Sequence, residues 1–145
     1  MSPMKKSGMA LVLSSGIIET IVAFEAYWIF YAMYKAGAAG VTIYTPMVLL
    51  LSGMLGGILA IIGAILIKTT KLGGPILSLV AAGLQLFATL FLIVQVSAMG
   101  GSNDAAMIIL PFFILPNALA IAGGTMAIIP PKDEAAKSES SKEEK

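Results

Sequence analysis

The chain has 145 residues, of which 58% are hydrophobic and 12% are charged, and its formal net charge is +1. Soluble domains carry about 25% charged residues, so this chain lacks the charge that solvates a globular surface, and its composition favours contact with lipid. Cys, His and Arg are absent, which excludes disulfides, thiolate or imidazole metal ligands and the commonest general base, and no basic patch favours nucleic acid. We therefore predict no enzyme activity and no cofactor.

Four nearly uncharged apolar stretches follow one another along the chain, at residues 9–34, 45–67, 74–99 and 105–129. Each is longer than the ~20 residues with which a helix crosses the hydrocarbon of a bilayer. In lipid the backbone must satisfy its own hydrogen bonds, and spanning strands would be shorter and would alternate polar with apolar residues. The sequence therefore predicts an all-α polytopic membrane protein, with one four-helix transmembrane domain over residues 1–131.

Glycine, proline and polar residues separate the predicted spans. Glycine-rich segments follow the first span at 35–40 and the third at 100–104, and a short turn at 69–75 joins the middle two. The prolines at 130–131 end the last helix, because proline cannot continue the helical hydrogen bonds. Residues 132–145 mix Lys, Glu and Ser with few apolar residues, so we predict a disordered, charged cytoplasmic tail.

The positions of the lysines predict the orientation. Lys5 and Lys6 precede the first span, Lys68 and Lys71 lie in the middle turn and four more lysines lie in the tail, whereas the other two connections hold Lys35 alone. Lysine-rich connections stay in the cytoplasm, so we predict a protein of the cell membrane with cytoplasmic N- and C-termini. A cleaved signal peptide is the alternative for the first span, but the apolar stretch continues well beyond a signal-peptide core.

The two halves of the chain resemble each other weakly. Residues 16–23 resemble residues 74–81, and residues 59–64 resemble residues 119–124, at nearly the same separation. The pattern is consistent with a duplicated helical hairpin, whose copies are related by an axis along the membrane normal. Chance similarity between apolar stretches is the alternative.

Glycine-rich motifs mark the second span, the turn after it and the last span. They read MLGGILAIIGAILIK at 54–68, KLGG at 71–74 and ILPNALAIAGG at 114–124. With these motifs, residues 50–130 resemble the small four-helix prokaryotic integral membrane proteins catalogued as a domain of unknown function. The resemblance implies a four-helix membrane fold, and it implies no activity, cofactor or binding residue.

Small residues recur at four-residue spacing on the last three predicted helices. Such stripes let helix backbones approach closely. The glycines that we predict to pack against other helices are Gly53, Gly57, Gly74, Gly123 and Gly124. Packing within the bundle and a face for a partner subunit are both consistent with these stripes.

Two glutamates, Glu19 and Glu25, lie inside the first predicted span. A charged side chain in hydrocarbon is costly, so such residues usually face the interior of a bundle. At about 1.5 Å per residue, Glu19 reaches the same depth as Gln85 and Asn117 near the middle of the bilayer, while Glu25 lies nearer the outer interface. The sequence therefore predicts an intramembrane polar network, which is either a hydrogen-bonded lock between helices or a proton or cation site. Glutamates that face the surface are a third interpretation.

These observations favour a non-enzymatic multi-pass membrane protein, an accessory or scaffolding subunit of a larger membrane complex. The short connections leave little surface outside the bilayer, so a membrane-protein partner or a second copy of the chain would be met within the lipid. The alternative function is a small proton- or cation-coupled transporter or channel that uses the intramembrane glutamates.

Overall fold

The computed structural model describes residues 2–98 and 104–129, with side chains for all of these except residues 104–107. In this part of the chain the regular structure consists of four helices: α1 (Pro3–Lys35), α2 (Tyr44–Ile67), α3 (Gly73–Ala98) and α4 (Asp104–Ile128). The predicted all-α, four-span fold is confirmed, because all four helices contain a segment that is long and apolar enough to cross a membrane. The predicted tail and most of the predicted connection before α4 lie outside the described residues.

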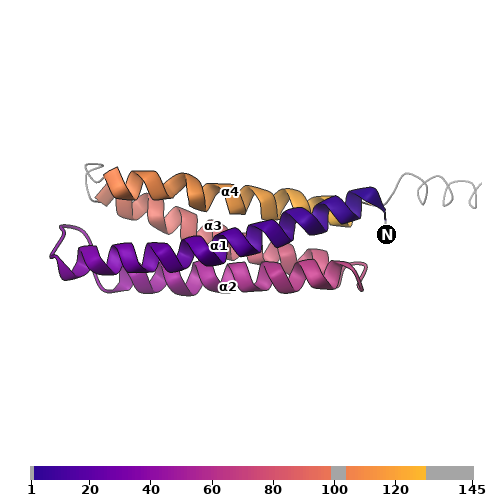
Figure 1. The fold of residues 1–145 in the computed structure, drawn as a ribbon, viewed down its shortest axis with the longest axis horizontal. Helices are drawn as coiled ribbons and strands as arrows, with labels where there is room; N and C mark the ends of the chain where they lie inside the picture. Colours follow the sequence, from indigo (N-terminus) through magenta and orange to yellow (C-terminus); the bar gives the residue numbers. More distant parts are fainter. Residues whose placement is uncertain (1, 99–103, 130–145) are drawn as a thin grey trace, which may run out of the picture.

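The helices lie side by side, and each runs antiparallel to the next (Figure 1). α1 packs against α2 and α4, and α3 packs against the same two helices. This is an up-and-down four-helix bundle. We call the end that carries the α2–α3 turn, residues 68–72, the turn end, and the end that carries the α1–α2 loop, residues 36–43, the loop end. The first residues of α1 and the last residues of α4 also lie at the turn end (Figure 1).

α1 begins at Pro3, earlier than the predicted start of the span at residue 9. The Ser2 hydroxyl accepts a hydrogen bond from the backbone N–H of Lys5 at 3.2 Å. Proline follows this N-cap at the first helical position, where its missing N–H leaves nothing unpaired. The predicted start was too late because hydrophobicity identifies only the apolar part of a helix, and the first turns of α1 are polar. The other helix ends lie within one residue of the predicted spans.

The loop end is closed by glycines and by one amide side chain. Gly37 has a φ of 73°, and the N–H of Ala38 donates to the Met33 carbonyl at 3.0 Å. A left-handed glycine followed by this bond is a common way to end a helix. The Gln95 Nε2 donates to the Gly40 carbonyl at 2.6 Å, which attaches the loop to α3.

The turn end is held together by Thr70. Its backbone N–H and its hydroxyl both donate to the Leu66 carbonyl at 2.8 Å. The same hydroxyl oxygen accepts from the N–H of Gly74 at 2.7 Å, and the Lys5 Nζ donates to the Thr70 carbonyl at 3.3 Å. The turn is therefore tied to both flanking helices and to the first turns of α1.

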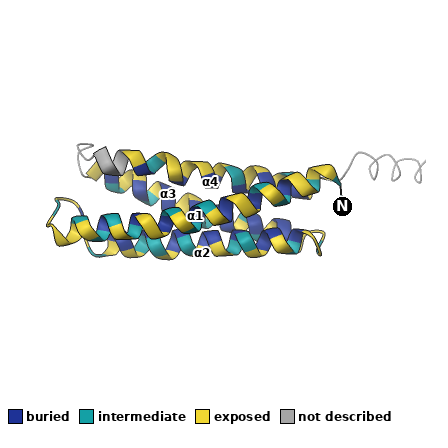
Figure 2. Ribbon diagram, viewed as in Figure 1, coloured by how far each residue is buried: buried dark blue, intermediate teal, exposed yellow. Residues whose placement is uncertain are grey.

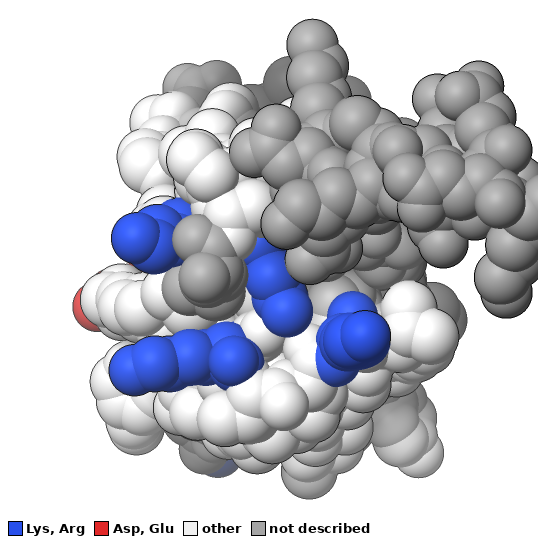
Figure 3. All heavy atoms as spheres, turned by 90° about the vertical axis from the view of Figure 1, so that its right-hand side faces the viewer, with Lys and Arg blue, Asp and Glu red and all other residues white. Residues whose placement is uncertain are grey.

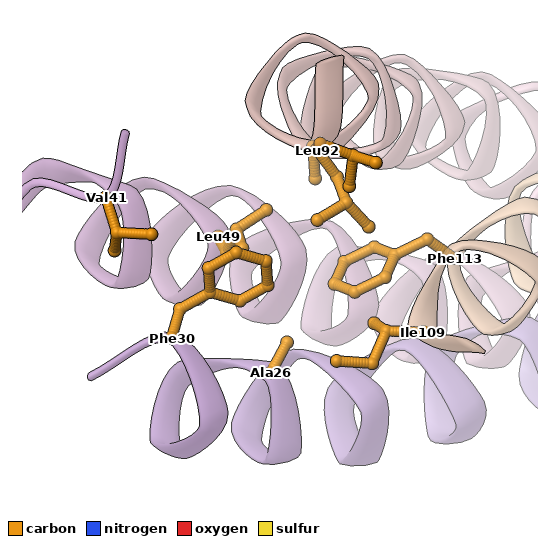
Figure 4. Close-up of a cluster of buried hydrophobic side chains, with 9 residues drawn as sticks. Ala26, Phe30, Val41, Leu49, Leu92, Ile109 and Phe113 are labelled. Atoms are coloured by element: carbon orange, nitrogen blue, oxygen red, sulfur yellow. The ribbon is translucent and has the colours of Figure 1, made fainter. Parts of the chain in front are cut away.

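Buried apolar side chains form one cluster in each half of the bundle. The loop-end cluster contains large side chains and draws on all four helices (Figure 4); it consists of Ala26, Phe30, Val41, Leu49, Ala88, Leu92, Val96, Ile109 and Phe113. The turn-end cluster is mostly alanine, and it consists of Val12, Ala60, Ala64, Ile67, Ala81 and Ala127. Side chains this small let the helices approach more closely at the turn end than phenylalanine allows at the loop end.

The outward faces of the helices are apolar as well. Exposed residues follow the outside of every helix (Figure 2), and they include Leu51, Val94 and Ile108, which are 67%, 66% and 64% exposed. Monomeric soluble proteins rarely expose so much continuous apolar surface. The arrangement is that of a bundle whose outer surface faces lipid.

Candidate functional site: a buried polar layer and an exposed glutamate

A layer of polar side chains lies between the two apolar clusters, and Glu19 is its only acid among the described residues. Ser15, Glu19, Gln85 and Asn117 are all buried, with Glu19 fully so. On α1, residues such as Val12, Ser15, Glu19 and Ala23 recur every three or four positions, so they share one inward face of the helix. The same spacing that buries the apolar residues of α1 therefore buries the glutamate.

Gly53 on α2 provides the space for the Glu19 side chain. A Cβ at position 53 would lie 3.4 Å from Glu19 Oε1 and 2.7 Å from the Cβ of Ala23. The carboxyl group therefore rests against a helix surface without a side chain. A larger residue at position 53 would compete with both neighbours on α1.

Neither oxygen of Glu19 has a hydrogen-bond partner among the described residues. The Gln85 Nε2 and the Thr45 hydroxyl are also buried without a partner there. The hydrogen-bonded lock expected between Glu19, Gln85 and Asn117 is therefore not formed. A buried polar group without a partner costs about 1–3 kcal/mol, and a buried ionised one costs more. Ionisable groups kept inside a membrane at such a cost often belong to functional sites.

The hydrogen bonds of the polar layer centre on Ser15. Its hydroxyl lies 2.5 Å from the Pro116 carbonyl oxygen and 3.2 Å from Gln85 Oε1. The Asn117 Nδ2 donates to the Ala82 carbonyl at 2.8 Å. These bonds join α1, α3 and α4 at one level and leave Glu19 outside the network.

Sequence reasoning missed Ser15. A serine in an apolar helix carries no charge and is too common to stand out. The signal that could have found it is its place one turn before Glu19 on the same face of α1, at the depth of Gln85.

Glu25 lies elsewhere, on the outside of the bundle. It is exposed, and it lines a groove of about 300 Å³ between α1 and α4, whose other lining residues are all apolar: Ile21, Val22, Ala26, Ile109 and Phe112. No described residue forms a hydrogen bond or an ion pair with its carboxylate. The structure therefore does not bring Glu25 together with the other predicted polar residues.

The predicted packing glycines all face neighbouring helices. At each of them an added Cβ would come closer than 3.0 Å to an atom of the neighbouring helix. Gly53, Gly57 and Gly123 face α1, Gly74 faces α2 and Gly124 faces α3.

Further close approaches that were not predicted include those at Gly8 and Gly63. A Cβ on Gly8 would lie 2.6 Å from the Gly123 carbonyl oxygen, and one on Gly63 would lie 2.6 Å from the Ser78 hydroxyl. Both glycines lack a small residue four positions away. A search for stripes of small residues therefore overlooks them.

The described side chains contain no group of three His, Cys, Asp or Glu residues that could hold a metal ion. Comparison with known proteins finds no family model, no curated protein and no solved structure that matches the chain. The resemblance of residues 50–130 to small four-helix membrane proteins therefore stays a prediction.

Proposed function

We propose that this protein is a non-enzymatic, membrane-embedded subunit that packs against a transmembrane helix of a partner protein. The observation that carries the proposal is the exposed Glu25 beside the apolar groove between α1 and α4. A carboxylate that faces hydrocarbon alone is costly, and a partner that supplies a hydrogen-bond donor or a cation removes most of that cost.

The surroundings of Glu25 favour a different protein over a second copy of this chain as the partner. None of the nine lysines lies within the apolar stretches 9–34, 45–67, 74–99 and 105–129, so a second copy has no cation to offer at this depth. A symmetric dimer across the groove would also bring two carboxylates together. The partner that fits is a transmembrane helix with Lys, Arg or an amide side chain facing Glu25.

Photo-crosslinking in native membranes tests this proposal. With benzoylphenylalanine in place of Phe112, which lines the groove, we expect one protein adduct of stoichiometric yield. The crosslinked peptide should come from a transmembrane segment that contains Lys, Arg or an amide residue. Replacing Glu25 with Leu in the same variant should abolish the adduct.

Phe87 on α3 is the matched control, because it is 55% exposed and Phe112 is 53% exposed. The same label at position 87 should yield only lipid adducts. Adducts to lipid alone at position 112, or an adduct that survives Glu25→Leu, would contradict the proposed interface. An adduct to a second copy of this chain would show that the groove is the interface of a homo-oligomer and not of a complex with a different protein.

The proposed orientation in the cell membrane places the turn end in the cytoplasm. This assignment depends on the lysines of that end and of the tail. We expect that cysteines introduced at Met4 or Ser140 are shielded from an impermeant thiol reagent in intact cells, and that a cysteine at Ser102 is labelled. Because the chain has no native cysteine, the signal comes from the introduced residue alone. Labelling at position 4 or 140 would reverse the orientation.

A proton- or cation-coupled transporter is the second candidate function. It is favoured by one observation, the fully buried Glu19 whose two oxygens have no partner among the described residues. Carboxylates in such places serve as proton or cation sites in transport proteins. Liposome flux measurements with Glu19→Gln separate this candidate from the accessory subunit.

A further inference from the structure

Four lysines gather on the turn end of the bundle (Figure 3): Lys5, Lys6, Lys68 and Lys71. Lys5 and Lys6 lie near the start of α1, Lys68 follows the last residue of α2, and Lys71 lies in the turn before α3. The two turn lysines and Lys6 are exposed, and Lys5 is half-buried. Segments far apart in the chain therefore place their ammonium groups on one small surface.

The backbone that carries these lysines is fixed. Lys68 and Lys71 flank Thr70, whose hydroxyl and N–H bind the end of α2 and whose hydroxyl also binds the start of α3. The Lys5 Nζ donates to the Thr70 carbonyl at 3.3 Å, which ties α1 to the turn. A charged surface on a fixed backbone loses less conformational entropy when it binds an ion than a flexible one does.

No described acid neutralises this surface. Among the residues whose side chains the structure describes, the carboxylates are Glu19, at the middle of α1, and Glu25, nearer the loop end. Apolar side chains are exposed in the turn and on the adjoining ends of α2 and α3: Ile65, Leu72 and Ile76 are 61%, 58% and 52% exposed. Within the described part of the chain, the surface therefore combines lysines that have no acidic partner with an adjacent apolar helix face, at the level where a spanning helix leaves the hydrocarbon.

We propose that the turn-end lysines bind the phosphate-bearing headgroup of an anionic phospholipid, whose acyl chains lie along the exposed faces of α2 and α3. An ammonium group next to the membrane attracts anionic headgroups. The exposed isoleucine and leucine side chains can pack against acyl chains. A soluble phosphate has no apolar part that could make this contact. The lipid ligand thus matches both the charge and the apolar part of this surface.

The test uses the full chain in nanodiscs of phosphatidylcholine and phosphatidylglycerol in equal parts. Native mass spectrometry after release from the nanodisc counts the lipids that stay bound. We expect wild-type protein to retain phosphatidylglycerol in preference to phosphatidylcholine. Lys68→Gln and Lys71→Gln should each lower this preference by about fivefold, the effect of one lysine near an anionic surface. High salt should lower it as well, because these charges are exposed to solvent.

Lys35→Gln is the matched control. It removes the same charge from the loop end, where the Lys35 ammonium lies 5.6 Å from the centre of the Tyr31 ring, and it should leave the lipid preference unchanged. An equal loss in Lys35→Gln, or no loss in the doubly substituted Lys68→Gln and Lys71→Gln protein, would overturn the proposal. The thermal unfolding of that double variant in phosphatidylcholine alone shows whether its fold is intact.

Inorganic phosphate distinguishes a lipid ligand from a soluble one. Added to wild-type protein in mixed nanodiscs, it should displace bound phosphatidylglycerol only as far as the same ionic strength of chloride does. Displacement by phosphate well beyond that of chloride would assign the surface to a soluble phosphate and would overturn the lipid assignment.

Discussion

Replacing Gly57 with Leu is expected to lower the free energy of unfolding by about 3 kcal/mol, the upper part of the usual range for overpacking. A Cβ at this position would lie 2.9 Å from the backbone nitrogen of Thr20 and 3.0 Å from the Gly16 carbonyl oxygen. Both contacts are with the backbone of α1, which cannot rotate away as a side chain can. A leucine would therefore force α1 and α2 apart along their whole contact.

Gly83→Leu is the control for this substitution. Nothing lies within 4 Å of a Cβ on Gly83, so the leucine side chain enters lipid, and the helix gains about 1 kcal/mol from the loss of a glycine. Thermal or denaturant unfolding in detergent, followed by circular dichroism, compares the two variants. Equal stability of Gly57→Leu and wild type would mean that the α1–α2 contact is absent in the folded protein.

The second large effect is expected at Glu19, where a substitution to Leu should stabilise the bundle by about 1–3 kcal/mol, the usual penalty for a buried polar group without a partner. Neither oxygen of Glu19 has a partner among the described residues, so leucine breaks no hydrogen bond. Glu19→Gln keeps a polar group in the same place and should change stability little. Unfolding in detergent measures both variants. A clear loss of stability in Glu19→Leu would show that the carboxyl group does have partners in the membrane.

The same variants separate the two candidate functions. As an accessory subunit, the purified protein should carry no proton or cation flux in liposomes. As a transporter it should carry a flux that Glu19→Gln abolishes, because an amide neither releases a proton nor supplies a negative charge. That result, with stability unchanged, would replace the accessory role with transport.

The number of helices and most of their ends were predictable from the sequence. Long uncharged stretches form helices in lipid, because the backbone must satisfy its own hydrogen bonds there. Glycine, proline and lysine mark where each stretch ends. The start of α1 was signalled by Ser2 and Pro3, but those signals are local and lie outside the apolar stretch. The depth of Glu19 and Gln85 was also predictable, because helical rise converts residue number into height.

What the sequence did not predict is how the side chains of that layer meet. The depth of a residue shows which other residues lie at the same height in the membrane. A hydrogen bond also depends on the rotation of each helix about its axis and on the rotamer of each side chain. Gln85 therefore meets Ser15, and Glu19 rests against Gly53. Likewise a stripe of small residues identifies a helix that packs closely, whereas the partner of each glycine follows only from the assembled bundle.

The contrast between the two ends of the bundle has a mechanical consequence. At the turn end, Gly8 and Gly123 bring the backbones of α1 and α4 into direct contact. At the loop end, the same two helices meet through rotatable side chains such as Phe113 and Ile109. If α1 and α4 move apart, the motion should therefore be a rotation about the glycine pair. It should increase the cross-sectional area of the protein only in the leaflet around the loop end. A partner bound beside Glu25 would act far from the glycine pair, where a small force separates the two helices most easily.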